Sequence, residues 1–349
     1  MKTGKSEIRP VILCLAAILM LCLAGSCAEF SSAPAAGTTP VKLITLRLAI
    51  ESFPEDSITQ EVDKFARSFN DHAKGKAEIV VYGNGCLGPS GQYIDMVRTG
   101  AIDLGVEPMV QTNPVYSVVD LPFLLNNKAA RRQAMEPILE TVFDKDFEKQ
   151  FNQRPISWYP VAYHDLGSVK KPIKTLEDMK GMLISVASPM QAQMVIALGG
   201  SSVQVDGPDV YGSLEKGVVD GILLPVNAAI AMNLSKVMHY WTVCNVHTAY
   251  SSINVNLETF NKLPNDIQAI LVEEGKKCGE STTNRVDTQE MVLAYELKQS
   301  GVEFYELPAV EHERWRKACL ALWNEEIARV GPKAETIIAI ANEANKNFP

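Results

Sequence analysis

The chain has 349 residues and a formal net charge of −8 at pH 7, and hydrophobic residue types make up 46% of it. This balance of apolar and charged residues is typical of a folded protein with a sizeable core. The acidic charge argues against a protein that binds nucleic acid, or an anionic lipid surface, through charge alone.

The first 27 residues have the pattern of a secretory signal. Basic residues precede an apolar run over 11–23, which is too short to cross a bilayer as a helix, and the run ends in Ala24-Gly25-Ser26-Cys27. This order predicts a bacterial lipoprotein signal peptide over 1–26, with Cys27 as the lipidated first residue of the mature chain. The alternative is ordinary cleavage near Ala28, which discards Cys27. Both alternatives place the mature protein in the periplasm, and the first anchors it to a membrane through lipid alone.

Four cysteines follow Cys27 and are widely spaced along the chain. They form no C-x-x-C pair and have no nearby pair of histidines, which argues against a zinc site. We expect isolated, buried thiols, while disulfides stay possible in an oxidising compartment. The four residues are Cys86, Cys244, Cys278 and Cys319.

Strands and helices alternate in the first part of the chain. Residues 27–40 are rich in Ser, Pro, Ala and Gly and predict a flexible tether. A strand is expected over 43–50, and Asp56 is placed to cap a helix whose apolar residues recur at helical spacing up to Phe69. Further elements are expected as strands over 77–82 and 102–106 and a helix over 90–99.

The alternation restarts in the second half. Strands are expected over 183–186, 203–205 and 219–223, separated by helices over 189–198 and 209–216. This pattern predicts parallel sheets with helices on both faces. We therefore expect one lobe over 41–165, which receives part of 250–300, and a second over 166–249. The region 250–349 is expected to supply a crossover strand, a long helix or a broken helix pair over 264–301, and C-terminal helices to both lobes.

One motif formally favours an enzyme. Gly83, Gly85 and Gly88 match G-x-G-x-x-G after a predicted strand, as in nicotinamide-dependent enzymes. The motif lies on the second strand, Pro89 follows it, and an exported chain has no supply of dinucleotide. We interpret the glycines as a turn from strand to helix. The chain has no G-x-S-x-G or H-E-x-x-H motif, and its histidines have no metal-ligand spacing, so no cofactor and no catalysis are expected.

Several segments, taken together and in order, resemble one family: the solute receptors of tripartite ATP-independent periplasmic (TRAP) transporters, the DctP-like family. The matching segments are YGNGCLG at 82–88, MVRTGAIDL at 96–104, DLPFL at 120–124, PIKTLEDMKG at 172–181, ALG at 197–199, DVY at 209–211, GVVDG at 217–221, His247 and LPND at 263–266. The resemblance implies an α/β, two-lobed periplasmic binding protein fold, with a ligand cleft between the lobes and a long helix bracing both. It implies capture of a small organic molecule and its delivery to membrane permease subunits, without catalysis.

The chain departs from the family where the family binds carboxylates. The family's hallmark arginine, which grips a substrate carboxylate with both nitrogens, falls on Ser185. A second basic position falls on Asp165, and Leu224 replaces a polar ligand contact. Together with Glu51 and Glu107, these exchanges predict a ligand that is neutral and hydroxylated, or cationic.

The resemblance also implies which residues face the ligand. Several have a simpler structural interpretation: Glu51 as a solvated loop acid, Glu107 as a strand end, and Asp165 as a partner of Lys170 or Lys171. The predicted ligand-binding residues are Glu51, Phe53, Glu107, Asp165, Ser185, Ser188, Leu224, Asn227 and His247.

Other functions stay open at this point. Within the receptor class, the second ligand candidate is a bulky hydrophobic or aromatic carboxylate held by a relocated base such as Arg98 or Lys170. A receptor that signals to a membrane sensor is another possibility. An exported enzyme is the weakest alternative, because no nucleophile or metal constellation is present.

Overall fold

The computed structural model describes residues 42–52, 56–109, 114–205 and 207–348. The predicted signal peptide, the tether and Cys27 lie outside the described residues, as does Phe53. The boundaries proposed for the lobes stay predictions.

The first part of the chain follows the predicted alternation of strands and helices. Asp56 caps the first long helix by accepting hydrogen bonds from the backbone N–H groups of Ile58 (2.8 Å) and Thr59 (3.3 Å). The apolar residues of that helix, among them Val62, Phe65 and Phe69, are buried on one side, as their spacing predicts. The elements are β1 (Ile44–Ala49), α1 (Ser57–Ala73), β2 (Ala77–Tyr82), η1 (Ser90–Gln92), α2 (Tyr93–Thr99) and β3 (Leu104–Pro108).

The middle of the chain holds elements that the sequence pattern did not predict. They are η3 (Pro114–Val118), α3 (Lys128–Val142), α4 (Lys145–Phe151) and β4 (Gln153–Ser168). Helix α3 contains Pro137 in its interior and is capped by Asn127, which accepts from the N–H groups of Ala129 and Ala130. Strand β4 contains Pro155 and Pro160, which are unusual inside a sheet.

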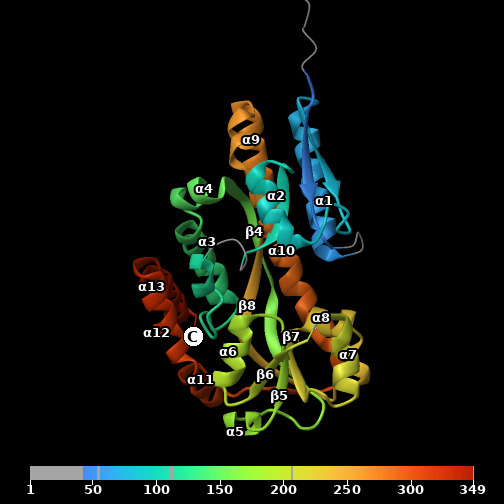
Figure 1. The fold of residues 1–349 in the computed structure, drawn as a ribbon, viewed down its shortest axis with the longest axis vertical. Coiled ribbons are helices and arrows are strands. Elements are labelled where there is room, and N and C mark those ends of the chain that lie inside the picture. Colours follow the sequence, from blue (N-terminus) through green and yellow to red (C-terminus); the bar gives the residue numbers. More distant parts are fainter. Residues whose placement is uncertain (1–41, 53–55, 110–113, 206, 349) are drawn as a thin grey trace, which may run out of the picture. The chain divides into compact units, whose positions relative to one another are not determined.

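The second part again follows the prediction to within a few residues. Its elements are α5 (Leu176–Met179), β5 (Leu183–Val186), α6 (Pro189–Ala197), β6 (Ser201–Gln204), α7 (Gly207–Glu215), β7 (Gly221–Pro225), α8 (Val226–Ala231), η4 (Leu234–Lys236) and β8 (Tyr240–Asn256). The C-terminal region adds α9 (Leu257–Lys262), the long helix α10 (Asn265–Gln299), β9 (Glu303–Glu306), α11 (Ala309–Ala318), α12 (Leu320–Val330) and α13 (Pro332–Asn347), as Figure 1 shows.

The described strands form one mixed sheet, in the order β2-β1-β3-β8-β4-β7-β5-β6, with β9 paired to β8. Strands β1, β2 and β3 are parallel to one another, and so are β5, β6 and β7. The expectation of parallel sheets therefore holds within each group but is wrong for the whole. The long strands β4 and β8 pair antiparallel with each other and join the two groups into a single sheet.

Helices cover both faces of this sheet, as predicted. Helix α1 packs with α10 over β1, β2 and β4, while α2 covers β3 and β8. Helix α8 packs on β4 and β7, and α13 packs on α3. Because α10 contacts α1, β4 and α8, it braces both strand groups, as the predicted long helix was expected to do.

Two glycines allow α10 to approach β4 closely. A Cβ atom on Gly275 would lie 2.4 Å from the carbonyl oxygen of Ile156, and one on Gly279 would lie 2.7 Å from that of Trp158. Any larger residue would collide with the strand backbone. The spacing of these glycines, one helical turn apart, therefore fixes the contact between α10 and β4.

The described part of the chain has no helix that is both long and apolar enough to cross a bilayer. Within the same residues, no cluster of His, Cys, Asp and Glu side chains is arranged to hold a metal ion. Cys244, Cys278 and Cys319 are buried thiols without a disulfide, as expected, whereas Cys86 is exposed.

Candidate functional site

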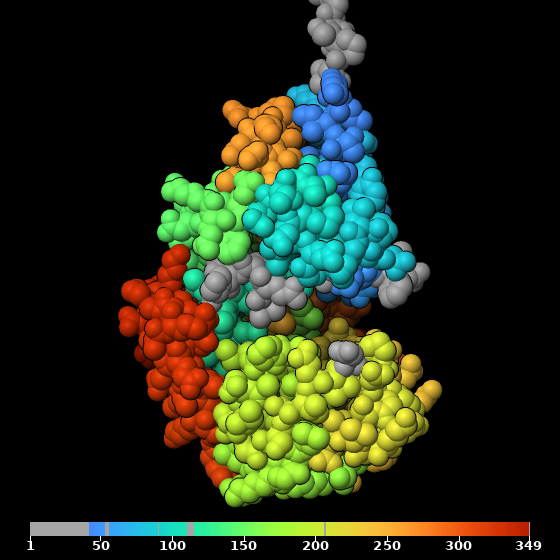
Figure 2. Space-filling view, viewed as in Figure 1, coloured from blue at the N-terminus to red at the C-terminus, as the bar shows by residue number. Residues whose placement is uncertain are grey.

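The carboxyl ends of the two parallel strand groups point toward each other. Strand β3 ends with Pro108 beside Ser251 of β8, and Ser251 pairs in turn with Tyr159 of β4. Strand β7 runs the opposite way and ends with Pro225 beside His164 of β4. The two ends are thus separated along β4 by residues 160–163, a span of roughly 15 Å. Figure 2 shows the surface hollowed between the cyan segment around α2 and the yellow segment around α7.

Ligands of open α/β sheets bind beyond the carboxyl ends of the strands, where the topology reverses. Here two such edges face the same space, with the middle of β4 and β8 as its floor. We therefore take the space between the strand ends as the candidate cleft. Most of the predicted ligand residues belong to these strand ends or to the floor between them.

Glu107 is the predicted ligand residue nearest the end of β3. It lies in β3, has no exposed surface and accepts a hydrogen bond of 2.8 Å from the side-chain amide of Asn254. Its other oxygen, Oε1, has no hydrogen-bond partner among the described residues. Burial raises the pKa of Glu107 to about 8, although the bond from Asn254 acts in the opposite direction. At neutral pH this carboxyl is therefore uncharged and can donate as well as accept a hydrogen bond.

Asp165 is held by the protein itself. Its carboxylate accepts from the backbone N–H groups of Cys244 (2.9 Å) and Asn245 (2.8 Å) and from Nε1 of Trp241 (3.2 Å). These bonds secure an irregularity where the pairing of β4 with β8 shifts register next to His164. Burial raises the pKa of Asp165 to about 7, against the effect of the backbone bonds. The suggested partner Lys170 instead pairs with Asp220.

Leu224 is part of the core. Its side chain is 5% exposed and packs in the apolar cluster under α7 and α8, together with Trp241 and Val226. The neighbouring Leu223 faces the opposite side of the sheet and packs in another cluster. Neither leucine presents an open apolar wall.

Ser185 and Ser188 lie at and just beyond the end of β5. Ser185 is 1% exposed and pairs in register with Val203 of β6 and Ile222 of β7. Ser188 is half-buried and caps α6 by accepting from the N–H of Gln191 at 3.2 Å. A serine at 185 supplies no positive charge to this edge of the cleft.

Glu51 and Asn227 are exposed. Glu51 follows β1, and its charge acts on the nearby phenol of Tyr93. Asn227 lies in the first turn of α8, directly after β7. Both positions border the space between the strand ends.

His247 lies on the floor of the cleft, where other side chains contact its ring. Its ring stacks on that of His164, with centroids 4.2 Å apart. The amide of Gln191 accepts from the N–H of Ala187 through Oε1, so its nitrogen, 3.2 Å from His247 Nε2, is the donor. His247 Nε2 is then the acceptor, and its Nδ1 lies 3.4 Å from Oδ1 of Asp120.

Burial, together with the neighbouring His247, holds the pKa of His164 well below its usual range. His164 is therefore an uncharged part of the floor at neutral pH.

Several residues around the floor were not predicted from the sequence. Gln191 and Asn254 were missed because nothing in their local pattern marks them, whereas Asp120 begins the matching segment DLPFL but was given no role; all three meet the site through long-range packing. Arg131 carried a signal: a charged residue in line with apolar positions of α3, which includes Ala134 and Ile138. Because Pro137 interrupts the helical pattern, α3 was not predicted, and the signal at Arg131 was missed.

Comparison with known proteins identifies the family. The model of the bacterial extracellular solute-binding proteins, family 7 (DctP), matches residues 49–329. Among curated relatives, the 2,3-diketo-L-gulonate-binding periplasmic protein YiaO of Escherichia coli is 24% identical over 272 residues, which cover 76% of this chain and 82% of the relative.

Solved structures share the fold. A TRAP periplasmic solute-binding protein from Ochrobactrum anthropi aligns with a TM-score of 0.83 at 19% identity, over 88% of this chain and 97% of that protein. A TRAP solute-binding protein from Chromohalobacter salexigens with bound D-glucuronate aligns with a TM-score of 0.76 at 19% identity, over 86% of this chain and 99% of that one.

Proposed function

Since this chain belongs to the bacterial extracellular solute-binding proteins of family 7, we propose that it captures a small organic molecule between its facing strand ends and delivers it to TRAP permease subunits. The family consists of periplasmic receptors for solutes, not enzymes. The observation that supports the proposal is the convergence of β1 and β3 with β5 and β7 on one space. A solute bound there contacts both strand groups at once, so binding favours a closed arrangement.

The ligand we propose is uncharged and hydroxylated. Ser185 stands where the family resemblance places a carboxylate-binding arginine, and it brings no charge. Glu107 is uncharged at neutral pH and offers one donor and one acceptor, which suits a hydroxyl group. A hydroxyl of the solute that meets Glu107 Oε1 satisfies an oxygen that otherwise lacks a partner.

A cationic ligand, the other member of the predicted class, has weaker support. It would need a carboxylate in the cleft, yet Glu107 is uncharged and Asp165 is fully engaged by three donors. Glu51 is the predicted acid that remains, and it is exposed to water, which screens its charge.

A sugar acid is the second candidate, because the relatives named above carry 2,3-diketo-L-gulonate and D-glucuronate in their names. The two bases suggested for a bulky hydrophobic or aromatic carboxylate have other partners: Arg98 bonds to Asp95 on α2, and Lys170 pairs with Asp220. A carboxylate in the cleft would therefore need a different cation.

We also propose that the mature chain is anchored by lipid at Cys27. The support is the order of the sequence alone: basic start, short apolar run, small residues and cysteine. Radiolabelled palmitate incorporated by wild type, and absent from Cys27→Ala, is the expected result. Equal labelling of both proteins would contradict the proposal.

Matched solutes that differ only in charge test the ligand class. The mature protein is melted with galactitol and with galactonate, and with D-glucose and D-glucuronate, at pH 7. A solute that binds only the folded state raises the melting temperature. We expect a rise with at least one neutral member and none with its acid, across a panel of such pairs. A rise with acids alone would contradict the ligand class and leave the receptor role intact.

A further inference from the structure

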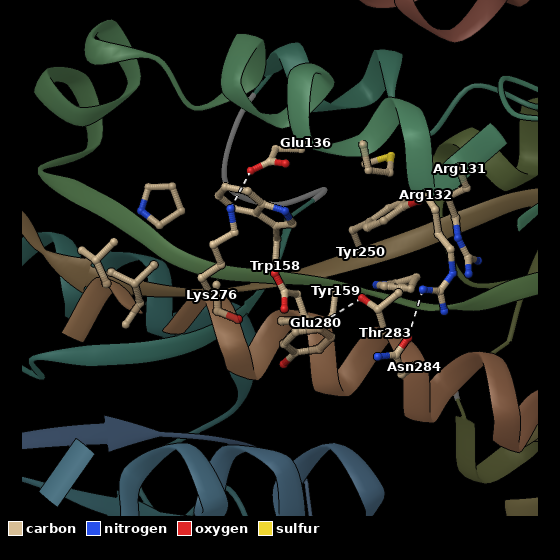
Figure 3. Close-up of a pocket in the computed structure, with 17 residues that line it drawn as sticks. Arg131, Arg132, Glu136, Trp158, Tyr159, Tyr250, Lys276, Glu280, Thr283 and Asn284 are labelled. Atoms are coloured by element: carbon tan, nitrogen blue, oxygen red, sulfur yellow. Dashed lines mark hydrogen bonds and ion pairs between the residues drawn. The ribbon is translucent and has the colours of Figure 1, made fainter. Parts of the chain in front are cut away.

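A separate hollow lies on the other side of β4. It has a volume of about 460 Å³, within the range of small-molecule pockets, which is roughly 300–1,000 Å³. It exists because β7 pairs with β4 only from His164 onward, which leaves the edge of β4 over 155–160 without a neighbouring strand. Helices α3 and α10 flank this edge, and Figure 3 shows the pocket between them.

The pocket has an apolar and aromatic body. Trp158, Tyr159 and Tyr250 line it together with the prolines of β4 and Met135 of α3. Trp158 is half-buried, whereas the other three tryptophans of the chain, at 241, 315 and 323, are buried in the core. A flat apolar ring placed here would lie against aromatic side chains and lose contact with water.

One end of the pocket carries an excess of positive charge. Arg132 donates to Asp287 (Nε, 3.0 Å) and to Asn284 (Nη1, 2.9 Å), and Arg131 pairs with the same Asp287. Two guanidinium groups thus share one carboxylate. At the middle of the pocket, Lys276 and Glu136 bridge α10 and α3 over 3.1 Å, and Glu280 adds a second carboxylate beside Lys276 (Figure 3).

Two buried hydrogen-bond donors near these guanidinium groups lack an acceptor among the described residues. Arg131 is 1% exposed, and its Nη1 has no hydrogen-bond partner among the described residues. The hydroxyl of Tyr250, which is 4% exposed, also lacks one there. Leaving such groups buried without partners is unfavourable, so a ligand that satisfies them gains affinity.

We propose that this pocket is a second binding site, for an aromatic monocarboxylate whose ring lies against Trp158 and whose carboxylate meets Arg131 and Arg132. The shape, the aromatic lining and the two guanidinium groups that share the single carboxylate of Asp287 at one end select that chemistry together. None of the predicted cleft residues that the structure describes lines the pocket, so it is a site distinct from the cleft, although Arg131 borders both. Because α3, β4 and α10 form its walls, an acid bound here ties those elements together.

The probe for the test is 2-naphthoate, and 2-naphthamide is its uncharged match. Both are titrated into the mature protein by calorimetry, and the emission of Trp158 is followed in parallel. We expect saturable 1:1 binding of 2-naphthoate with a change in emission that Trp158→Phe removes. Arg132→Met should weaken the binding of 2-naphthoate about tenfold or more, since a charge-assisted hydrogen bond is lost. The affinity for 2-naphthamide should change little. Arg98→Met, an exposed arginine on α2, is the control and should leave both affinities unchanged.

A bulky residue inside the pocket gives an independent test. Thr283→Phe should abolish binding of both probes, with folding verified by its melting curve. If that variant does not fold, Arg132→Met decides alone. Absence of saturable binding up to millimolar 2-naphthoate would overturn the proposal. So would binding that Arg132→Met leaves unchanged, or binding that is lost in the cleft variant Glu107→Gln.

Discussion

The side-chain amide of Asn254 donates a hydrogen bond of 2.8 Å to Oε2 of Glu107, a carboxyl group with no exposed surface. The bond orients the carboxyl but does not offset its burial, which raises the pKa to about 8. The strand end that the sequence marks as acidic therefore presents an uncharged group at neutral pH. In the proposed function, that difference favours uncharged solutes in the cleft.

The first prediction concerns the proton on Glu107. The folded chain keeps this proton up to about pH 8, whereas the unfolded chain releases it near the ordinary value of 4.5. Between these values the folded state binds more protons, so the free energy of unfolding falls as the pH rises. The Glu107→Gln variant has no such proton. We expect the stability of wild type relative to this variant to fall by a few kcal/mol, about 1.4 kcal/mol per pH unit at most, between pH 5 and pH 8.

Urea denaturation of both proteins at pH 5, 6, 7 and 8 gives this difference directly. A difference that stays constant across the four pH values would show that the carboxyl is already ionised in the folded chain. The argument for an uncharged cleft would then fail as well.

The second prediction separates structure from binding at Asp165. Asp165→Ala leaves the N–H groups of Cys244 and Asn245 and Nε1 of Trp241 without their acceptor. We expect a loss of about 2–4 kcal/mol in the free energy of unfolding, measured in urea, because several buried donors lose their partner. Asp71→Ala, at an exposed position of α1, should change stability by less than about 0.5 kcal/mol. Unchanged stability combined with lost solute binding would instead make Asp165 a ligand residue.

The third prediction tests the contact between α10 and β4. Gly279→Ala places a methyl group 2.7 Å from the carbonyl oxygen of Trp158, so we expect a loss of about 1–3 kcal/mol. The matched control is Gly212→Ala in α7, where a Cβ meets nothing within 4 Å. That change should stabilise by about 0.5–1 kcal/mol, since alanine favours a helix. Thermal melts that move in the same direction for both variants would contradict the close packing.

The fourth prediction restores the charge that the cleft lacks. Ser185→Arg puts a guanidinium at the end of β5, where the family resemblance places one. We expect the variant to gain binding of D-glucuronate, seen by calorimetry, and to lose affinity for the neutral solute. Ser185→Met, of similar length but uncharged, is the control and should gain nothing. Wild type that already binds D-glucuronate as well as the arginine variant does would show that another cation serves the cleft.

Local sequence pattern predicts the two parallel strand groups well, because their strands are short, apolar and bounded by helix caps. Asp56 and the apolar stripe of α1 are an example. The same reasoning missed β4, whose prolines and Gly167 hide its extended form, and α3, whose Pro137 interrupts the expected pattern. Antiparallel pairing of β4 with β8 joins residues far apart in the chain, and no local pattern carries it.

The strand ends that border the candidate cleft could be predicted from the sequence, but the directions of their side chains could not. Glu107 lies near the end of β3 and Ser188 just beyond β5, and their contact with a ligand stays a prediction. Which face a residue presents depends on irregularities in pairing: the shift next to His164 turns Asp165 toward backbone donors. Leu224 likewise packs into the core rather than beside a ligand. Such shifts are set by tertiary packing.

The most direct measurement is the identity of the solute that the protein carries when it is purified from its own periplasm. The mature chain is isolated without added ligand and denatured, and the released small molecules are identified by mass spectrometry, with Glu107→Ala prepared in parallel. An uncharged, polyhydroxylated compound present with wild type and depleted in the variant is the expected result. A carboxylic acid released in its place, in stoichiometric amount, would contradict the uncharged cleft.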